Sequence, residues 1–255
     1  MAQQVFPINS HKHEDLLMTK LRNILFFITL LSVVGWGPAE FFSSLFAPMP
    51  TIPANAQDWV AKEVNEINTQ ADNIDQKVLK LSLLAYLNAN NKGIVGNPYL
   101  TIIDYSKPSS ERRLWVVDMR NDKVLFNTWV THGKNSGDVM ATSFSNEPGS
   151  LKSSIGVFLT QTPYTGGNGY SLRLIGLEQG INDNAYRRSI VVHGAWYADP
   201  NVILTRGQIG RSWGCPAVSP STARPLINTI KDNSLVVVYY PDRNWLRHSQ
   251  FLAAG

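Results

Sequence analysis

The chain has 255 residues, of which 44% are hydrophobic and 16% are charged. This composition supports one or two globular domains with a full core, and it excludes a disordered, collagen-like or polytopic membrane protein. The formal net charge of +4 fits an ordinary basic protein or an anionic partner such as a cell-wall polymer or a membrane surface. The sequence has no arginine-rich block and no basic helix with interleaved aromatic residues, so we expect no nucleic-acid binding.

Residues 1–56 have the pattern of a signal peptide. Lys20 and Arg22 precede an apolar run at 24–34, and small residues at Ala54 and Ala56 suit a cleavage site. The stretch between the run and that site is long and partly apolar, so an uncleaved membrane anchor is the alternative. Either interpretation predicts that the rest of the chain lies outside the cytoplasm, in the periplasm or cell envelope.

Residues 57–96 form a predicted helical segment. Apolar residues recur there at alternating steps of four and three, which is typical of a helix with one buried face, and Gly93 is suited to end it. A short coiled coil is the alternative, but fewer than four heptads and extra leucines on other faces favour packing on the following domain. The periodic positions are Val60, Val64, Ile67, Ala71, Ile74, Val78, Leu81 and Ala85.

Residues 97–242 change to a pattern typical of β-strands, with apolar and β-branched runs separated by turns. Ser219 is the expected cap of a short helix at 223–230, and 243–255 is a predicted C-terminal tail. The pattern predicts a mainly β domain with one late helix, and the absence of βα repeats excludes a Rossmann fold or a βα barrel. The predicted strands are 99–105, 113–118, 124–130, 154–160, 172–177, 189–193 and 235–240.

Cys215 is the only cysteine, so it has no partner for an intramolecular disulfide. A thiol with an ordinary pKa of about 8.5 is protonated at neutral pH and needs a base to become a nucleophile. His193, at the end of a predicted strand, is the candidate base. Gly214 leaves room for substrate beside the sulfur, and the N–H groups of Gly214 and Cys215 are candidate donors to a developing oxyanion.

Other uses of these residues are open at this point. A lone cysteine is most often a small buried apolar residue, and a histidine after a strand is usually structural. His132, His193 and Cys215 could form a zinc site, but the sequence has no closely spaced ligand pair. The stretch 182–184 suits a loop better than a Ca²⁺ site. We therefore expect no metal and no cofactor.

The order His193-Gly194 followed by Ser212-Trp213-Gly214-Cys215 resembles the catalytic signature of the L,D-transpeptidases, the YkuD-type family. The surrounding sequence is closer to the divergent branch called murein L,D-transpeptidase catalytic domain-like, and the resemblance covers about 97–242. It implies a mainly β (α+β) fold, a β-sandwich with one late helix after an N-terminal helical segment. The further marks are Gly169-Tyr170-Ser171-Leu172, Gly176-Leu177-Glu178, Asn182-Asp183-Asn184-Ala185, Val192-His193-Gly194-Ala195 and Gly214-Cys215-Pro216-Ala217.

The resemblance implies that Cys215 attacks a peptidoglycan stem peptide at the carbonyl beside the diaminopimelate L-centre and expels the terminal D-alanine. His193 acts as general base and then as acid, and an amine of a second stem converts the thioester into a crosslink. If water takes that role, the enzyme is an L,D-carboxypeptidase. A catalytically weak peptidoglycan-binding envelope protein is the alternative from a different class.

Common family members place an arginine two residues after the cysteine, where this chain has Pro216-Ala217. The contribution of that arginine is missing or comes from Arg211, Arg206 or Arg173. The aromatic residues Trp196 and Tyr197 are further candidates to wall the groove. The residues expected to bind substrate are Gly194, Ser212, Trp213, Arg211, Tyr170 and His132.

Overall fold

The computed structural model describes residues 54–252, except residue 72. Almost all of the predicted signal peptide or anchor lies outside the described residues. Within them, no helix is both long enough and apolar enough to cross a membrane.

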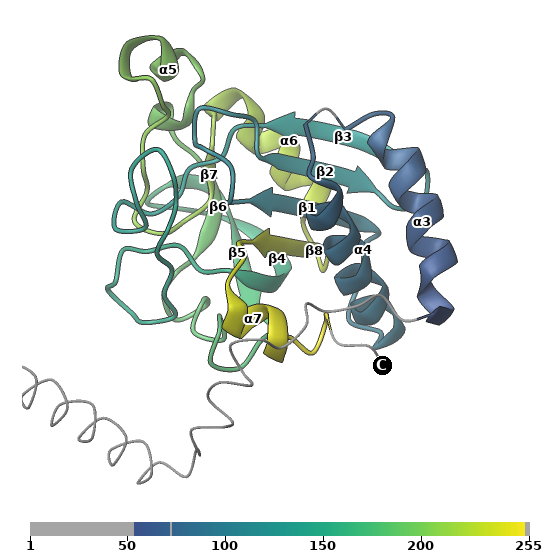
Figure 1. The fold of residues 1–255 in the computed structure, drawn as a ribbon. Coiled ribbons are helices and arrows are strands. Elements are labelled where there is room, and N and C mark those ends of the chain that lie inside the picture. Colours follow the sequence, from purple (N-terminus) through teal and green to yellow (C-terminus); the bar gives the residue numbers. More distant parts are fainter. Residues whose placement is uncertain (1–53, 72, 253–255) are drawn as a thin grey trace, which may run out of the picture. The chain divides into compact units, whose positions relative to one another are not determined.

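Eight strands form one mixed sheet with the order β3-β2-β1-β8-β4-β5-β6-β7 (Figure 1). The pairs β1–β8 and β6–β7 are parallel and the other neighbours are antiparallel. The strands are β1 (Tyr99–Asp104), β2 (Leu114–Asp118), β3 (Lys123–Thr128), β4 (Gly156–Gly166), β5 (Gly169–Gly176), β6 (Val191–Gly194), β7 (Ala217–Val218) and β8 (Leu235–Tyr239). All seven predicted strands are present, and the mainly β (α+β) class is confirmed.

The predicted late helix is α6 (Pro220–Ile230), and Ser219 caps it by accepting from the backbone N–H of Thr222. Three short helices were not predicted: η1 (Trp196–Ala198), α5 (Asn201–Arg206) and α7 (Arg243–His248). Strand β7 was also missed, because two residues are too few to show a periodicity.

The predicted helical segment contains two helices, α3 (Ala54–Asn68) and α4 (Gln76–Asn91), where the periodicity predicted one. The side chain of Asp75 accepts from the backbone N–H groups of Lys77 and Val78, which starts a new helix there. Asn73, just before it, has a left-handed φ of 68°. Every periodic apolar position is nevertheless buried, because the connection between the helices keeps the same side inward.

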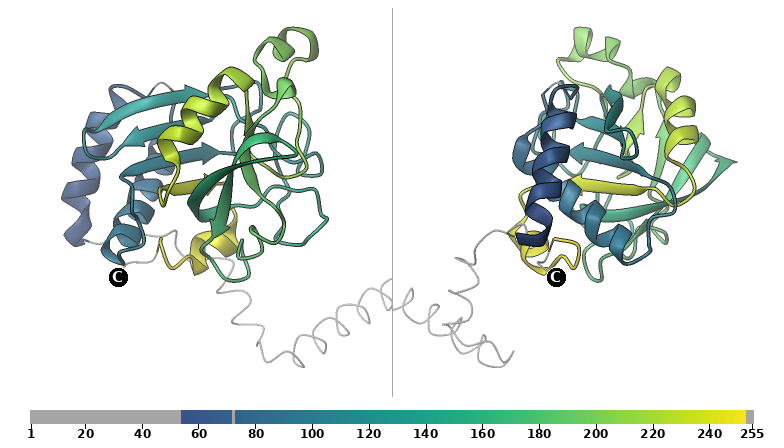
Figure 2. Two further views of the ribbon diagram at one scale, coloured as in Figure 1. Left: turned by 180° about the vertical axis from the view of Figure 1, so that it is seen from behind. Right: turned by 90° about the vertical axis from the view of Figure 1, so that its right-hand side faces the viewer.

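Helices α4 and α6 lie on opposite faces of the sheet (Figure 2). Helix α4 packs on β1 and β8, whereas α6 packs on the other face against strands from β6 to β1. Leu79, Leu83 and Leu84 of α4 are completely buried. The extra leucines therefore belong to the core of the following domain, which confirms packing on that domain over a coiled coil.

The C-terminal segment is part of the core and not a loose tail. Trp245 and Phe251 are completely buried, and the Trp245 indole Nε1 donates to Glu178 Oε2 at 2.9 Å. The backbone carbonyl of Phe251 accepts from the Asn88 side chain at 2.9 Å. Apolar side chains in α7 and after it thus complete the domain, and the boundary predicted at residue 242 falls inside it.

Candidate active site

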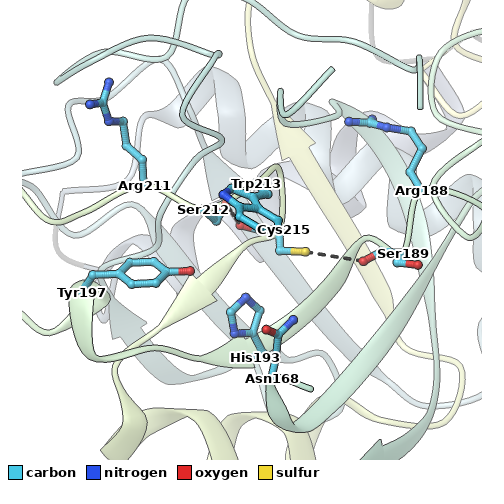
Figure 3. A pocket seen from close by; sticks show the side chains of 9 residues that line it. All are labelled: Asn168, Arg188, Ser189, His193, Tyr197, Arg211, Ser212, Trp213 and Cys215. Atoms are coloured by element: carbon cyan, nitrogen blue, oxygen red, sulfur yellow. Dashed lines mark hydrogen bonds between the residues drawn. The ribbon is translucent and has the colours of Figure 1, made fainter. Parts of the chain in front are cut away.

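A cleft of about 440 Å³ lies at the end of the sheet formed by β6 and β7 (Figure 3). Five of the residues predicted for the site line it: Cys215, His193, Ser212, Trp213 and Arg211. Its other lining residues are Asn168, Arg188, Ser189 and Tyr197. Of these, only Tyr197 was named from the sequence, as a candidate groove aromatic.

The loop that presents Cys215 is closed by the hydroxyl of Ser212. Ser212 Oγ donates to the backbone carbonyl of Cys215 at 2.6 Å and accepts from the backbone N–H of Gly214 at 3.1 Å. The Ser212 backbone N–H in turn donates to the carbonyl of His132 at 2.9 Å. Ser212 therefore joins the cysteine loop to the loop that follows β3.

Gly214 must be glycine for two reasons. Its φ is 119°, which side chains rarely adopt, and an added Cβ would lie 2.6 Å from the backbone carbonyl oxygen of Lys152. The expectation that its N–H helps to form an oxyanion hole is not met, because that N–H already donates to Ser212. The N–H of Cys215 donates to no acceptor within the described part of the chain, so it is the remaining candidate.

The Cys215 thiol is held by the segment that leads into β6. Its Sγ donates to the carbonyl oxygen of Ser189 at 3.5 Å, and Ser189 has a left-handed φ of 55° (Figure 3). Burial raises the pKa of Cys215 above its ordinary value, although the backbone N–H of Val191 and the charge of Arg188 lower it in part. Cys215 is therefore a neutral thiol at neutral pH.

His193 ends β6 and is almost fully buried. Its Nδ1 lies 3.1 Å from the carbonyl oxygen of Gly194. Since a carbonyl can only accept, Nδ1 carries the proton and Nε2 keeps its lone pair. Burial lowers the pKa of His193, so the imidazole is neutral and able to take a proton. No hydrogen bond joins it to the thiol among the described residues.

Tyr170 and Gly194, both predicted to bind substrate, face helix α6 and are not among the cleft-lining residues. The hydroxyl of Tyr170 donates to Asn228 Oδ1 at 2.7 Å, and Arg224 lies over its ring. An added Cβ at Gly194 would lie 2.9 Å from Cβ of Ala223. Gly194 is therefore needed for the close approach of α6 to β6.

His132 also lies away from the cleft, which differs from the expectation of a substrate-binding residue. Its side chain is completely buried, and its Nδ1 is 2.8 Å from Nη2 of Arg113. Burial and the Arg113 charge lower the pKa of His132 to about 4. The neutral imidazole of His132 accepts a hydrogen bond from the Arg113 guanidinium, and Arg113 also donates twice to the carbonyl of Val130.

The arginines proposed to replace the missing one lie in different places. Arg211 lines the cleft, where it donates to the carbonyl of Gly137 at 3.0 Å and pairs with Asp138 at 3.3 Å. Arg173 stacks on the rings of Tyr164 and Tyr186, and Arg206 ends α5. Neither is among the residues that line the cleft. Arg188 does line it and was missed, because its loop has no periodic pattern that distinguishes one arginine from the next.

Two predicted motifs serve the framework. Glu178 Oε2 accepts from the backbone N–H of Val157 at 2.7 Å, and the Asn182 side chain donates to the carbonyls of Ile155 and Val157. These bonds tie the 178–182 loop to β4, which supports loop chemistry at 182–184. Among residues 54–252, leaving out 72, no three His, Cys, Asp or Glu side chains are grouped to hold a metal ion.

Comparison with known proteins gives a family match over residues 70–239, to the L,D-transpeptidase catalytic domain. The match begins before residue 97, so it includes α4, which the sequence resemblance had left outside. No curated protein matches the chain.

The chain is also similar to solved structures of L,D-transpeptidases. One from Mycobacterium smegmatis is 15% identical over 57% of this chain and 60% of that chain, with a TM-score of 0.36. L,D-transpeptidase 1 of Mycobacterium tuberculosis is 14% identical over 57% and 63%, with a TM-score of 0.33. One from Stackebrandtia nassauensis is 12% identical over 76% and 97%, with a TM-score of 0.33. This chain thus spans less than two thirds of the two mycobacterial proteins.

By its match over residues 70–239, the chain belongs to the family of L,D-transpeptidase catalytic domains.

Proposed function

We propose that the protein is a peptidoglycan L,D-transpeptidase in which Cys215 forms an acyl-enzyme with a stem peptide. The observation that carries the proposal is the pairing in one cleft of the chain's single thiol with an imidazole whose Nε2 is free to accept a proton. The family assignment supports the reaction class, acyl transfer on peptidoglycan stems.

The reaction starts from two neutral groups, since burial raises the pKa of Cys215 and lowers that of His193. The thiol hydrogen turns from the Ser189 carbonyl to His193 Nε2, and the sulfur attacks the stem carbonyl beside the diaminopimelate L-centre. The oxyanion of the tetrahedral intermediate accepts from the Cys215 N–H. His193 then returns the proton to the departing amine of the D-amino acid, which leaves a thioester.

An amine of a second stem attacks the thioester carbonyl, and His193 takes the amine's proton and returns it to the sulfur. The product is an amide crosslink and a free thiol. Attack by water in the same step gives a shortened stem and makes the enzyme an L,D-carboxypeptidase.

Arg211 is the cleft arginine whose side chain is 39% exposed, and its charge suits a carboxylate of the stem.

The site of action follows from the substrate. Peptidoglycan lies outside the cytoplasm, and the N-terminal 56 residues have the pattern of a signal peptide or an anchor. We therefore propose that the protein works in the periplasm or cell envelope, with membrane association through this segment as the alternative to cleavage.

The test is incubation of the purified protein with tetrapeptide muropeptides, followed by mass spectrometry of both protein and products. We expect crosslinked dimers and an acyl adduct on the wild type, and neither with Cys215→Ala. Shortened stems without dimers would identify the carboxypeptidase, whereas stem binding with no product from the wild type would overturn the enzyme in favour of a peptidoglycan-binding protein. His193→Asn serves as a second variant that keeps the thiol and removes the base.

A further inference from the structure

Arg188 makes an unusual set of hydrogen bonds beside the cleft. Its Nη1 donates to the backbone carbonyl of Ser145 and to Oγ of Ser154, and its Nη2 donates to Lys152 O at 2.6 Å and to Ser150 Oγ at 3.1 Å. All four acceptors are neutral oxygens on the 145–154 loop. Within residues 54–252, apart from 72, no carboxylate lies at ion-pair distance from this guanidinium.

The 145–154 loop is the support on which the cysteine loop rests. The Lys152 carbonyl that accepts from Arg188 is also the group an added Cβ at Gly214 would strike. The next residue, Ser153, donates through Oγ to the Gly214 carbonyl at 3.3 Å. Arg188 thus bonds the same loop that bonds Gly214, the residue before Cys215. Its neighbour Ser189 accepts a hydrogen bond from the Cys215 thiol.

The charge of Arg188 acts on the sulfur as well. It lowers the pKa of Cys215, against the larger effect of burial, and burial in turn lowers the pKa of Arg188. A half-buried cation without a carboxylate partner favours a nearby anion more strongly than an exposed one does. The other titratable groups that line the cleft, or act electrostatically on the thiol or on Arg188, are His193, Tyr197, Arg211, Tyr105 and Glu147. Glu147 lies on the 145–154 loop beyond ion-pair distance, and its charge raises the pKa of Arg188 against the larger effect of burial.

We propose that Arg188 is a positioning residue, which holds the 145–154 loop against the cysteine loop and, as a lining residue of the same cleft as Cys215, supplies a positive charge that stabilises the thiolate. It does so from the segment before β6, in a chain that has Ala217 two residues after the cysteine. The inference rests on the proposed function only in making Cys215 the nucleophile.

The test is the rate of alkylation of the purified full-length protein by iodoacetamide, measured from about pH 6 to about pH 10. The readout is unambiguous because Cys215 is the only cysteine. For Arg188→Gln we expect the alkylation rate at neutral pH to fall about fivefold and the pH profile to move to higher pH. Arg187→Gln is the matched control: it removes the same charge from the adjacent, exposed position and leaves the profile unchanged.

Arg188→Lys separates the positive charge of Arg188 from its hydrogen bonds to the 145–154 loop. It also provides a test if Arg188→Gln does not fold. Lysine keeps the positive charge but cannot form the four hydrogen bonds that the guanidinium makes to the loop. We expect a pH profile close to that of the wild type, with faster amide hydrogen exchange in the 145–154 loop. The charge role would be overturned if folded Arg188→Gln had the pH profile of the wild type. It would also be overturned if Arg188→Lys moved the pH profile as far as Arg188→Gln does. Because alkylation needs no peptidoglycan, this outcome is independent of whether the protein forms crosslinks.

Discussion

The hydroxyl of Ser212 donates to the carbonyl oxygen of Cys215 at 2.6 Å, and this bond closes the loop that presents the thiol. The same oxygen accepts from the Gly214 N–H, so Ser212→Ala leaves a buried donor and an acceptor without their partner. We expect a loss of about 1–3 kcal/mol in the free energy of unfolding. We also expect kcat/KM for crosslinking to fall at least about tenfold, because the thiol and the Cys215 N–H lose their fixed geometry.

Ser212→Thr is the control for this prediction, since threonine keeps the hydroxyl. It should recover most of the lost kcat/KM. Equal activity of Ser212→Ala and the wild type in a muropeptide assay would show that the loop keeps its shape without this hydroxyl.

The close contact between Gly214 and Lys152 predicts a steric limit at the cysteine loop. In Gly214→Ala the new methyl group meets the Lys152 carbonyl, and the left-handed φ adds backbone strain. We expect severe loss of alkylation and crosslinking, with a lower melting temperature. Gly207→Ala is the matched control, because Gly207 also has a positive φ, of 70°, but has no atom within 4 Å of the added Cβ. It should cost about 1 kcal/mol and leave activity intact, as measured by thermal melts and product formation.

The neutral state of the thiol and imidazole predicts a specific pH dependence. A preformed thiolate–imidazolium pair would react with iodoacetamide in mild acid, whereas burial of Cys215 and His193 opposes both charges. We expect alkylation to follow one ionisation above the ordinary thiol pKa. In contrast, kcat/KM for acylation rises through the lowered pKa of His193, below about pH 6.5, because only neutral imidazole accepts the proton. Rapid alkylation at about pH 5 would contradict the neutral pair.

Much of the fold can be predicted from the sequence, because local pattern determines it. Seven strands and the α6 helix follow from apolar runs, turn residues and a serine cap, all of which act over a few residues. The break between α3 and α4 was missed, since both helices keep the same buried side. Strand β7 was missed because only its partner β6 defines it.

The site divides in the same way. Cys215 and His193 were placed in one cleft from their spacing and flanking glycines, and the structure brings both there. The role of Arg188 depends on carbonyls from a loop about 40 residues away, which no local pattern reports. The Gly214 N–H was expected to be free, but whether Ser212 takes it depends on one side-chain rotamer. His132 was expected to bind substrate, but its side chain packs on Arg113, a contact that no local sequence pattern reports.

The burial of His132 predicts that the protein loses stability in mild acid. The pKa of His132 is lowered to about 4, against about 6.5 in an unfolded chain, so the unfolded state binds the extra proton between these values. Stability from this group is therefore present above about pH 6.5 and is lost as the pH falls toward 4. Between pH 7 and pH 4.5 the loss is about 2 kcal/mol.

In His132→Asn the amide can still accept from Arg113 but does not titrate, so urea unfolding should show a pH dependence smaller by that amount. His248→Asn, which removes an exposed histidine, should leave the pH dependence as in the wild type. The same pH dependence in His132→Asn and the wild type would show that another group causes the acid sensitivity.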